Sequence, residues 1–190
     1  EAFRIAKSGR PGPVLVDIPK DIQLAFAEYE KEEVVSPFEA KKAKEKYIAQ
    51  AAQLIAESER PYIYIGGGAM GQNMAEEIMA FAEKIDGYIG STFMGLSLIP
   101  SSYERFLGMQ GMHGHYASSM AQNEADLIIG VGVRFSDRAT GNVSKFAKNS
   151  KIIQLDPDFS EINKNVKVDC GIVGDVEHSF MEIAKRCEKK

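Results

Sequence analysis

Cysteine is scarce in this chain, and no stretch is apolar for long enough to span a membrane. The 190 residues include only Cys170 and Cys187, at a spacing that fits neither a zinc site nor a multi-bridge disulfide scaffold. We therefore expect two free thiols in a reducing compartment. The amino end, residues 1–4, has neither an initiating methionine nor a signal-peptide pattern, so we expect this sequence to be cut from a longer one.

A dense cluster of lysine and arginine is also missing. The formal net charge is -4, whereas nucleic acid phosphates demand a basic footprint, so we exclude nucleic acid as a partner. The chain is 44% hydrophobic and 26% charged, which suits one globular domain with a full core. It contains no nucleophile elbow, no Walker lysine loop and no supported Cys/His pair.

The first forty residues have the pattern of a domain end followed by a linker. A short amphipathic helix, a turn at residues 8–12 and a strand over 13–18 end at Pro19 without a following partner. We interpret residues 1–22 as the tail of a preceding domain. Residues 23–40 carry a charge run and Pro37, which is typical of a linker. The main domain is then residues 41–190.

From Lys41 on, helical and strand patterns alternate. Amphipathic helices are predicted around residues 47–58, 74–85 and 176–187, and a shorter helix contains Ile162. Apolar strands are predicted at residues 61–65, 88–92, 126–131, 151–155 and 166–170. Continuous apolar strands separated by helices predict an α/β fold, Rossmann-like, with a parallel sheet and helices on both faces.

The strand at 61–65 stops in Gly66-Gly67-Gly68, and a helix is predicted to begin at Gly71. Glycine permits close approach of another backbone or a phosphate, so a nucleotide-type cofactor is the first hypothesis. Gly66, Gly68 and Gly71 satisfy G-x-G-x-x-G, but a nicotinamide dehydrogenase needs an acidic residue where this chain has Thr92. The alternative is that the glycines merely make a tight turn.

Other strands also end in candidate ligands, which parallel topology would gather at one edge. Arg134 and Arg138 follow the strand at 126–131, where guanidinium groups can clamp a diphosphate or a carboxylate, unless nearby Asp137 pairs with them. Asp156 is expected to be free to bind a ligand hydroxyl, because a capping box at residues 158–161 already caps the next helix. Asp175 is either a second hydroxyl acceptor or an N-cap.

The run at residues 108–115 is rich in glycine and methionine. This composition favours an adaptable surface against a flat ring, although core packing is the default role of methionine. His113 and His115 are two apart, which does not suit a helical metal pair, and no further ligand lies nearby in sequence. We therefore expect no metal site.

Several runs of residues, spread over essentially the whole chain, resemble one protein family. They are residues 8–21 (SGRPGPVLVDIPKD), 66–68 (GGG), 92–96 (TFMGL), 111–114 (GMHG), 132–135 (GVRF) and 137–138 (DR). In order and spacing they are similar to the catalytic subunit of acetolactate (acetohydroxyacid) synthase. In that family three α/β domains occur in series, and the resemblance covers the tail of the first and the whole middle domain.

The resemblance implies an enzyme that joins pyruvate to a second 2-keto acid in branched-chain amino acid biosynthesis. It uses thiamine diphosphate and magnesium, and the middle domain binds an FAD without net redox role. By resemblance, Arg138 and Met112 face the second keto acid. The expected cofactor-binding residues are Gly66, Gly67, Gly68, Thr92, Phe93, Met94, Gln110, Gly111, Met112, His113, Gly132, Val133, Arg134, Ser136, Arg138, Asp156, Pro157, Asp175 and Val176.

The sequence departs from the family pattern at two places. The arginine run normally reads R-F-D-D-R and here has Ser136, and the strand after Lys151 ends in Asp156-Pro157 where an aliphatic residue is usual. The activating glutamate and the thiamine and metal motifs lie outside this chain, so no catalytic residue is expected in it and the segment alone is expected to be inactive.

The resemblance also implies partners and a location. We expect a homo-oligomer with a regulatory small subunit, flanking domains in the same chain, no membrane association, and a cytoplasmic, bacterial rather than organellar, protein. The alternative is a non-catalytic scaffold or oligomerisation domain of a related thiamine-diphosphate enzyme, of the 2-keto acid decarboxylase type, whose crevice is empty or differently occupied.

Overall fold

The computed structural model describes residues 1–30, 41–70 and 74–190. The chain divides into two units, Glu1–Ala40 and Lys41–Lys190. The described part of the first unit, residues 1–30, contains two short helices, α1 (Ala2–Ala6) and α2 (Lys20–Leu24). Part of the predicted linker at 23–40 lies outside the described residues, and the roles assigned to 1–22 and 23–40 remain predictions.

The predicted strand at 13–18 is wrong, because residues 11–19 form neither helix nor strand. Leu15 and Val16 are exposed there, by 88% and 61%. A strand needs a neighbour to pair its backbone groups, and none of the described residues provides one.

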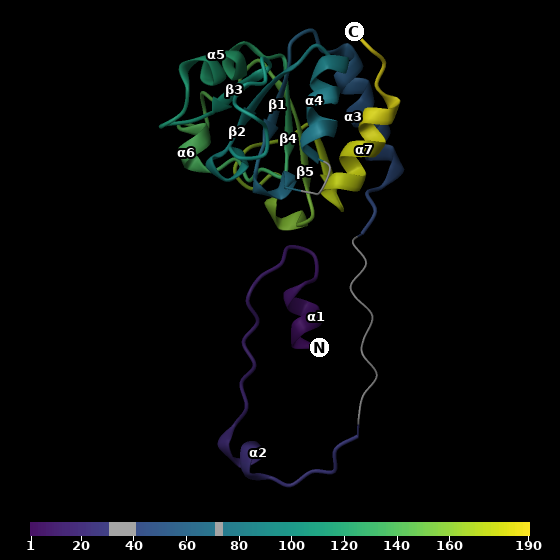
Figure 1. The fold of residues 1–190 in the computed structure, drawn as a ribbon, viewed down its shortest axis with the longest axis vertical. Helices are drawn as coiled ribbons and strands as arrows, with labels where there is room; N and C mark the ends of the chain where they lie inside the picture. The colour runs from purple at the N-terminus through teal and green to yellow at the C-terminus, as the bar shows by residue number, and fades with distance from the viewer. Residues whose placement is uncertain (31–40, 71–73) are drawn as a thin grey trace. The chain divides into compact units, whose positions relative to one another are not determined.

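The second unit is a six-stranded parallel sheet with the order β3-β2-β1-β4-β5-β6 (Figure 1). Its strands are β1 (Pro61–Ile65), β2 (Tyr88–Ser91), β3 (Phe106–Met109), β4 (Leu127–Val131), β5 (Lys151–Asp156) and β6 (Cys170–Val173). Its α-helices are α3 (Glu45–Glu57), α4 (Met74–Lys84), α5 (Tyr116–Glu124), α6 (Asp137–Thr140) and α7 (Val176–Arg186). The predicted Rossmann-like α/β fold is confirmed.

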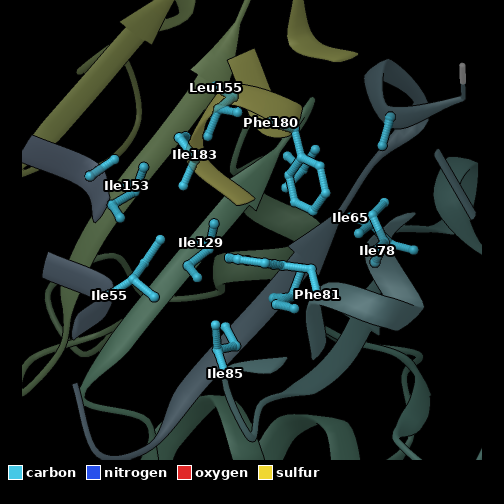
Figure 2. Packing of buried hydrophobic residues seen from close by; sticks show 14 of the residues in the cluster. Ile55, Ile65, Ile78, Phe81, Ile85, Ile129, Ile153, Leu155, Phe180 and Ile183 are labelled. Atoms are coloured by element: carbon cyan, nitrogen blue, oxygen red, sulfur yellow. The ribbon is translucent and has the colours of Figure 1, made fainter. Parts of the chain in front are cut away.

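One face of the sheet carries the larger core. Alternate strand residues such as Ile65 and Ile129 point to this face and pack under α3, α4 and α7, which lie together on one side in Figure 1. Figure 2 shows Phe81 of α4 and Phe180 of α7 meeting above these strands. Their ring centroids are 5.1 Å apart at 78°, an edge-to-face contact. The central strands β1 and β4 are buried on both faces, as expected for parallel sheets.

The opposite face has a smaller, more aromatic core. Tyr62, Tyr64 and Ile128 alternate with the residues above and pack with Phe135 under α5, α6 and the loop that contains Phe146. The Tyr64 and Phe135 rings lie 5.9 Å apart. Phe135 has a φ of 47°, and its ring is buried.

Glycine alternates with large residues in one register row of this face. Gly90, Tyr64, Gly130, Gln154 and Gly171 are neighbours across β2, β1, β4, β5 and β6. An added Cβ would lie 1.7 Å from the Tyr62 hydroxyl at Gly90, 2.8 Å from the Phe135 ring at Gly130, and 2.5 Å from Ile162 at Gly171. The row therefore gives space to side chains that fold back over the sheet.

Several details of the second unit differ from the sequence-based expectation. β3, α5 and α6 were not predicted, and β6 begins at Cys170 instead of Val166. Ile162 follows a three-residue 3-10 turn, η3 (Phe159–Glu161), instead of lying in a helix. The other 3-10 turns are η1 (Gly67–Ala69) and η2 (Phe93–Gly95). The predicted helix start at Gly71 lies outside the described residues.

Candidate functional site

All six strands run in the same direction, so their carboxyl ends meet at one edge of the sheet. The chain runs outward from β1 to β2 and β3, and then from β4 to β5 and β6 on the other side. The order therefore reverses between β1 and β4. Open α/β sheets bind ligands at such a switch point, and the predicted site residues follow the strands at this edge.

The glycines at the switch point pack against each other. Gly66 donates its N–H to Val131 at 3.0 Å, and Gly68 donates to the Gly132 carbonyl at 3.1 Å. An added Cβ would lie 2.3 Å from the Gly132 carbonyl at Gly66 and 2.7 Å from the Gly132 Cα at Gly68. Backbone packing thus accounts for these two glycines, as the tight-turn alternative held. Gly67 is exposed.

The loop after β2 presents apolar side chains. Phe93 and Met94 are 75% and 66% exposed. A Cβ on Gly67 would lie 3.2 Å from the Met94 Cβ, so these two loops touch. The Thr92 hydroxyl accepts the Gly95 N–H at 3.2 Å and caps η2.

The loop after β3 is attached to α6. Met112 donates its N–H to the Arg138 carbonyl at 2.9 Å. Gly111, with φ 109°, lies so close that an added Cβ would be 2.5 Å from the same carbonyl. The Met112 side chain is 64% exposed, and its sulfur lies 3.8 Å from Nη1 of Arg138. The structure therefore brings together the two residues predicted to face the substrate.

Both arginines after β4 are exposed. Within the part of the chain that the structure describes, neither guanidinium forms an ion pair, so the surface pairing with Asp137 is not seen. Asp137 instead accepts the Arg138 backbone N–H at 2.9 Å. Val133, directly before Arg134, is buried, and Ser136, between the two arginines, is exposed.

The acidic residues and Gln110 have structural partners. Asp156 is only 5% exposed and accepts the Asp158 N–H at 2.9 Å, so the expectation that it is free is wrong: it turns the chain at Pro157. Asp175 accepts the His178 N–H at 2.7 Å and is the N-cap of α7, ahead of buried Val176. Gln110 is buried and accepts the Tyr62 hydroxyl at 3.2 Å.

The two histidines of the glycine-methionine loop lie apart in role. Both are exposed, and the His115 ring also packs against Gly108, where an added Cβ would lie 2.5 Å from Nδ1. The described residues contain no group of three or more His, Cys, Asp or Glu that could hold a metal ion. Nor does any helix in those residues have the length and apolar character to cross a membrane.

Sequence reasoning missed Tyr62 and Ser118. Burial raises the pKa of the Tyr62 hydroxyl well above its ordinary value, so it remains protonated and available as a donor. It lies 2.8 Å from the Ser118 hydroxyl. The one signal in the sequence was Gly90, whose missing side chain makes room for this hydroxyl.

The chain is similar to known proteins over most of its length. Residues 48–183 match the family described as thiamine pyrophosphate enzyme, central domain. The acetolactate synthase large subunit of Haemophilus influenzae is 39% identical over 187 residues, covering 96% of this chain and 33% of that protein. That of Corynebacterium glutamicum is 43% identical over 180 residues, covering 92% and 28%. The chloroplastic acetolactate synthase of Arabidopsis thaliana is 39% identical over 195 residues, covering 100% and 29%.

The chain thus spans about a third of the length of the curated relatives it matches. The family match covers most of the second unit, including every strand of the sheet. The chain therefore belongs to the thiamine pyrophosphate enzymes, whose central domain it contains.

Proposed function

We propose that residues 41–190 hold an FAD, as the middle domain of an acetolactate synthase. In that role the chain binds and orients the cofactor, and it carries no catalytic residue of its own. Thiamine diphosphate and magnesium would be held by segments outside it, and thiamine diphosphate would supply the carbanion chemistry that joins pyruvate to the second 2-keto acid.

One juxtaposition carries this proposal: exposed Met112 lies beside the guanidinium of Arg138, at the carboxyl edge of a switch-point sheet. FAD combines a flat ring system with a diphosphate. Methionines are adaptable partners for a flat ring, and guanidinium groups are planar donors to phosphate or carboxylate. Exposed Phe93 and Met94 extend the apolar surface. The residues present therefore fit the group.

Within the predicted set, the structure supports a division of roles. We assign direct contact with FAD to residues that are exposed at this edge, namely Gly67, Phe93, Met94, His113 and Arg134. Gly66, Gly68, Gln110, Gly132, Asp156 and Asp175 would act by shaping the loops, because their atoms already contact protein groups.

The substrate assignment follows from charge. Arg138 offers a guanidinium without an ion pair among the described residues, and a 2-keto acid carries a carboxylate, which guanidinium binds with charge-assisted hydrogen bonds. We assign Arg138 and Met112 to the face that meets the second keto acid. The expectation of a homo-oligomer with a regulatory small subunit comes from the family resemblance alone.

Flavin titration of the full-length protein tests the proposal. Arg134→Ala should weaken FAD binding by tenfold or more, because a hydrogen bond to a charged group contributes about 1.5–3 kcal/mol. Arg186→Ala, on the outer surface of α7 where it pairs with Glu45, is the matched control and should bind normally. Protein that stays colourless, with an unfolding temperature unchanged by saturating FAD, would reject the proposal in favour of the scaffold alternative.

A further inference from the structure

A buried polar network lies directly beneath the loop that presents Met112. The Tyr62 hydroxyl bonds to Oε1 of Gln110 at 3.2 Å and to the Ser118 hydroxyl at 2.8 Å. Ser118 in turn donates to the Gly108 carbonyl at 3.2 Å. The three side chains are 5% exposed or less. One hydroxyl on β1 thus contacts Gln110, directly after β3, and Ser118, in the first turn of α5.

This network is connected to the candidate site through two hydrogen bonds to backbone carbonyls of α6. Nε2 of Gln110 lies 3.5 Å from the Ala139 carbonyl in α6. Two residues further, Met112 donates to the Arg138 carbonyl at 2.9 Å. The loop is therefore held to α6 from inside by Gln110 and at the surface by Met112.

We propose that Tyr62 is a positioning residue: through Gln110 its hydroxyl holds residues 110–115 against α6, and this sets Met112 beside Arg138 for the flavin. The flavin part rests on the proposed function. The loop-holding part stands on the hydrogen bonds alone. A buried acceptor that loses its donor costs free energy, so removal of the hydroxyl releases the loop.

The chain contains a matched control on the same strand. Tyr64 lies two residues along β1 on the same face of the sheet and is equally buried. Its hydroxyl has no hydrogen-bond partner among the described residues. Tyr62→Phe and Tyr64→Phe therefore remove the same atom from the same environment, but only the first removes hydrogen bonds.

Hydrogen exchange of the full-length protein without flavin is the first readout. The amides of Gln110, Met112 and His115 are bonded to Ser91, Arg138 and Met109. In Tyr62→Phe the peptide covering residues 109–116 should exchange at least threefold faster than in wild type, and in Tyr64→Phe at the wild-type rate. Equal exchange in the two variants would overturn the proposal.

Flavin affinity is the second readout. Tyr62→Phe should weaken FAD binding at least threefold and alter the visible spectrum of the bound flavin, and Tyr64→Phe should do neither. Faster exchange with unchanged affinity and spectrum would also overturn the positioning role. If wild type binds no flavin, the proposed function fails, and the exchange comparison alone decides whether Tyr62 holds the loop. Gln110→Leu, of similar volume, is the second variant should Tyr62→Phe not fold, with the same expected pattern.

Discussion

Gly68 and Gly132 meet backbone to backbone at the point where the strand order reverses, with the Gly68 N–H bonded to the Gly132 carbonyl at 3.1 Å. Gly132 has a φ of 61°, and an added Cβ would lie 2.3 Å from the Gly68 carbonyl carbon. The contact joins the loops after β1 and β4, both of which carry predicted site residues.

Gly132→Ala should destabilise the protein by about 2–4 kcal/mol, from overpacking added to the left-handed backbone conformation. Gly141 is the control, because it has a φ of 59° and nothing within 4 Å of an added Cβ. Gly141→Ala should cost only about 1–2 kcal/mol. Urea unfolding measures both, and equal losses would show that the contact with Gly68 carries no cost.

Asp126 links the start of β4 to the start of β1. Its carboxylate accepts the Ser58 hydroxyl at 2.5 Å and the Glu59 and Arg60 N–H groups at 2.7 and 3.0 Å. Burial acts to raise its pKa, but these hydrogen bonds outweigh burial, and the pKa lies below the ordinary value of 3.8. Asp126→Ala should therefore lose about 1–3 kcal/mol at pH 7.

The pH dependence of this effect has a definite sign. A carboxyl group with a lowered folded-state pKa contributes stability that is fully present well above pH 3.8 and is lost as the pH falls through the folded-state pKa. The difference between wild type and Asp126→Ala should shrink over that window, as measured by urea unfolding at several pH values. Exposed Glu59→Gln serves as the control, and a difference that stays constant with pH would contradict the assignment.

The two thiols should be unreactive in the folded protein. Cys170 and Cys187 are free and buried. Burial, and then the charge of Asp169, raise the pKa of Cys170 to about 11 from its ordinary value of 9.0. Two pKa units mean about a hundredfold less thiolate. Ellman's reagent at pH 8 should label neither thiol rapidly in the native protein and both in urea, whereas rapid native labelling of Cys170 would refute this.

Substitution of Phe180 measures how much packing in the larger core contributes to stability. It is 1% exposed and meets Phe81 edge to face, so Phe180→Ala should cost about 3–5 kcal/mol. Phe159, which is 77% exposed, is the matched phenylalanine, and Phe159→Ala should stay within about 0.5 kcal/mol of wild type. Thermal unfolding distinguishes the two, and similar shifts would mean that burial does not set the cost.

Strong hydrophobic patterns predicted most of the fold. β1, β4 and β5 are buried almost throughout, so their sequences read as continuous apolar runs. β3 escaped prediction because it is a short edge strand of half-buried residues with a glycine inside. The strand before α7 was misplaced because Val166 is apolar and buried but lies in the loop ahead of β6.

The candidate site was predictable in outline, because parallel strands bring their carboxyl ends together whatever the side chains do. The hydrogen-bond partner of each polar side chain could not be predicted from the sequence. Asp156 and Gln110 look available in the sequence, yet the first accepts a backbone N–H two residues on and the second meets a tyrosine from another strand. The first partner is local and depends on how the chain turns at Pro157, and the second is a tertiary contact, so neither can be assigned from the sequence pattern.

The row in which glycine alternates with Tyr64 and Gln154 limits how this domain can be redesigned. Each glycine leaves room for a neighbour's ring or branch, so the positions form interlocking pairs. Libraries that vary one position at a time will return mostly unfolded clones at the row. Laboratory evolution aimed at new cofactors should instead begin from the exposed side chains Phe93, Met94 and Met112 in the loops after β2 and β3.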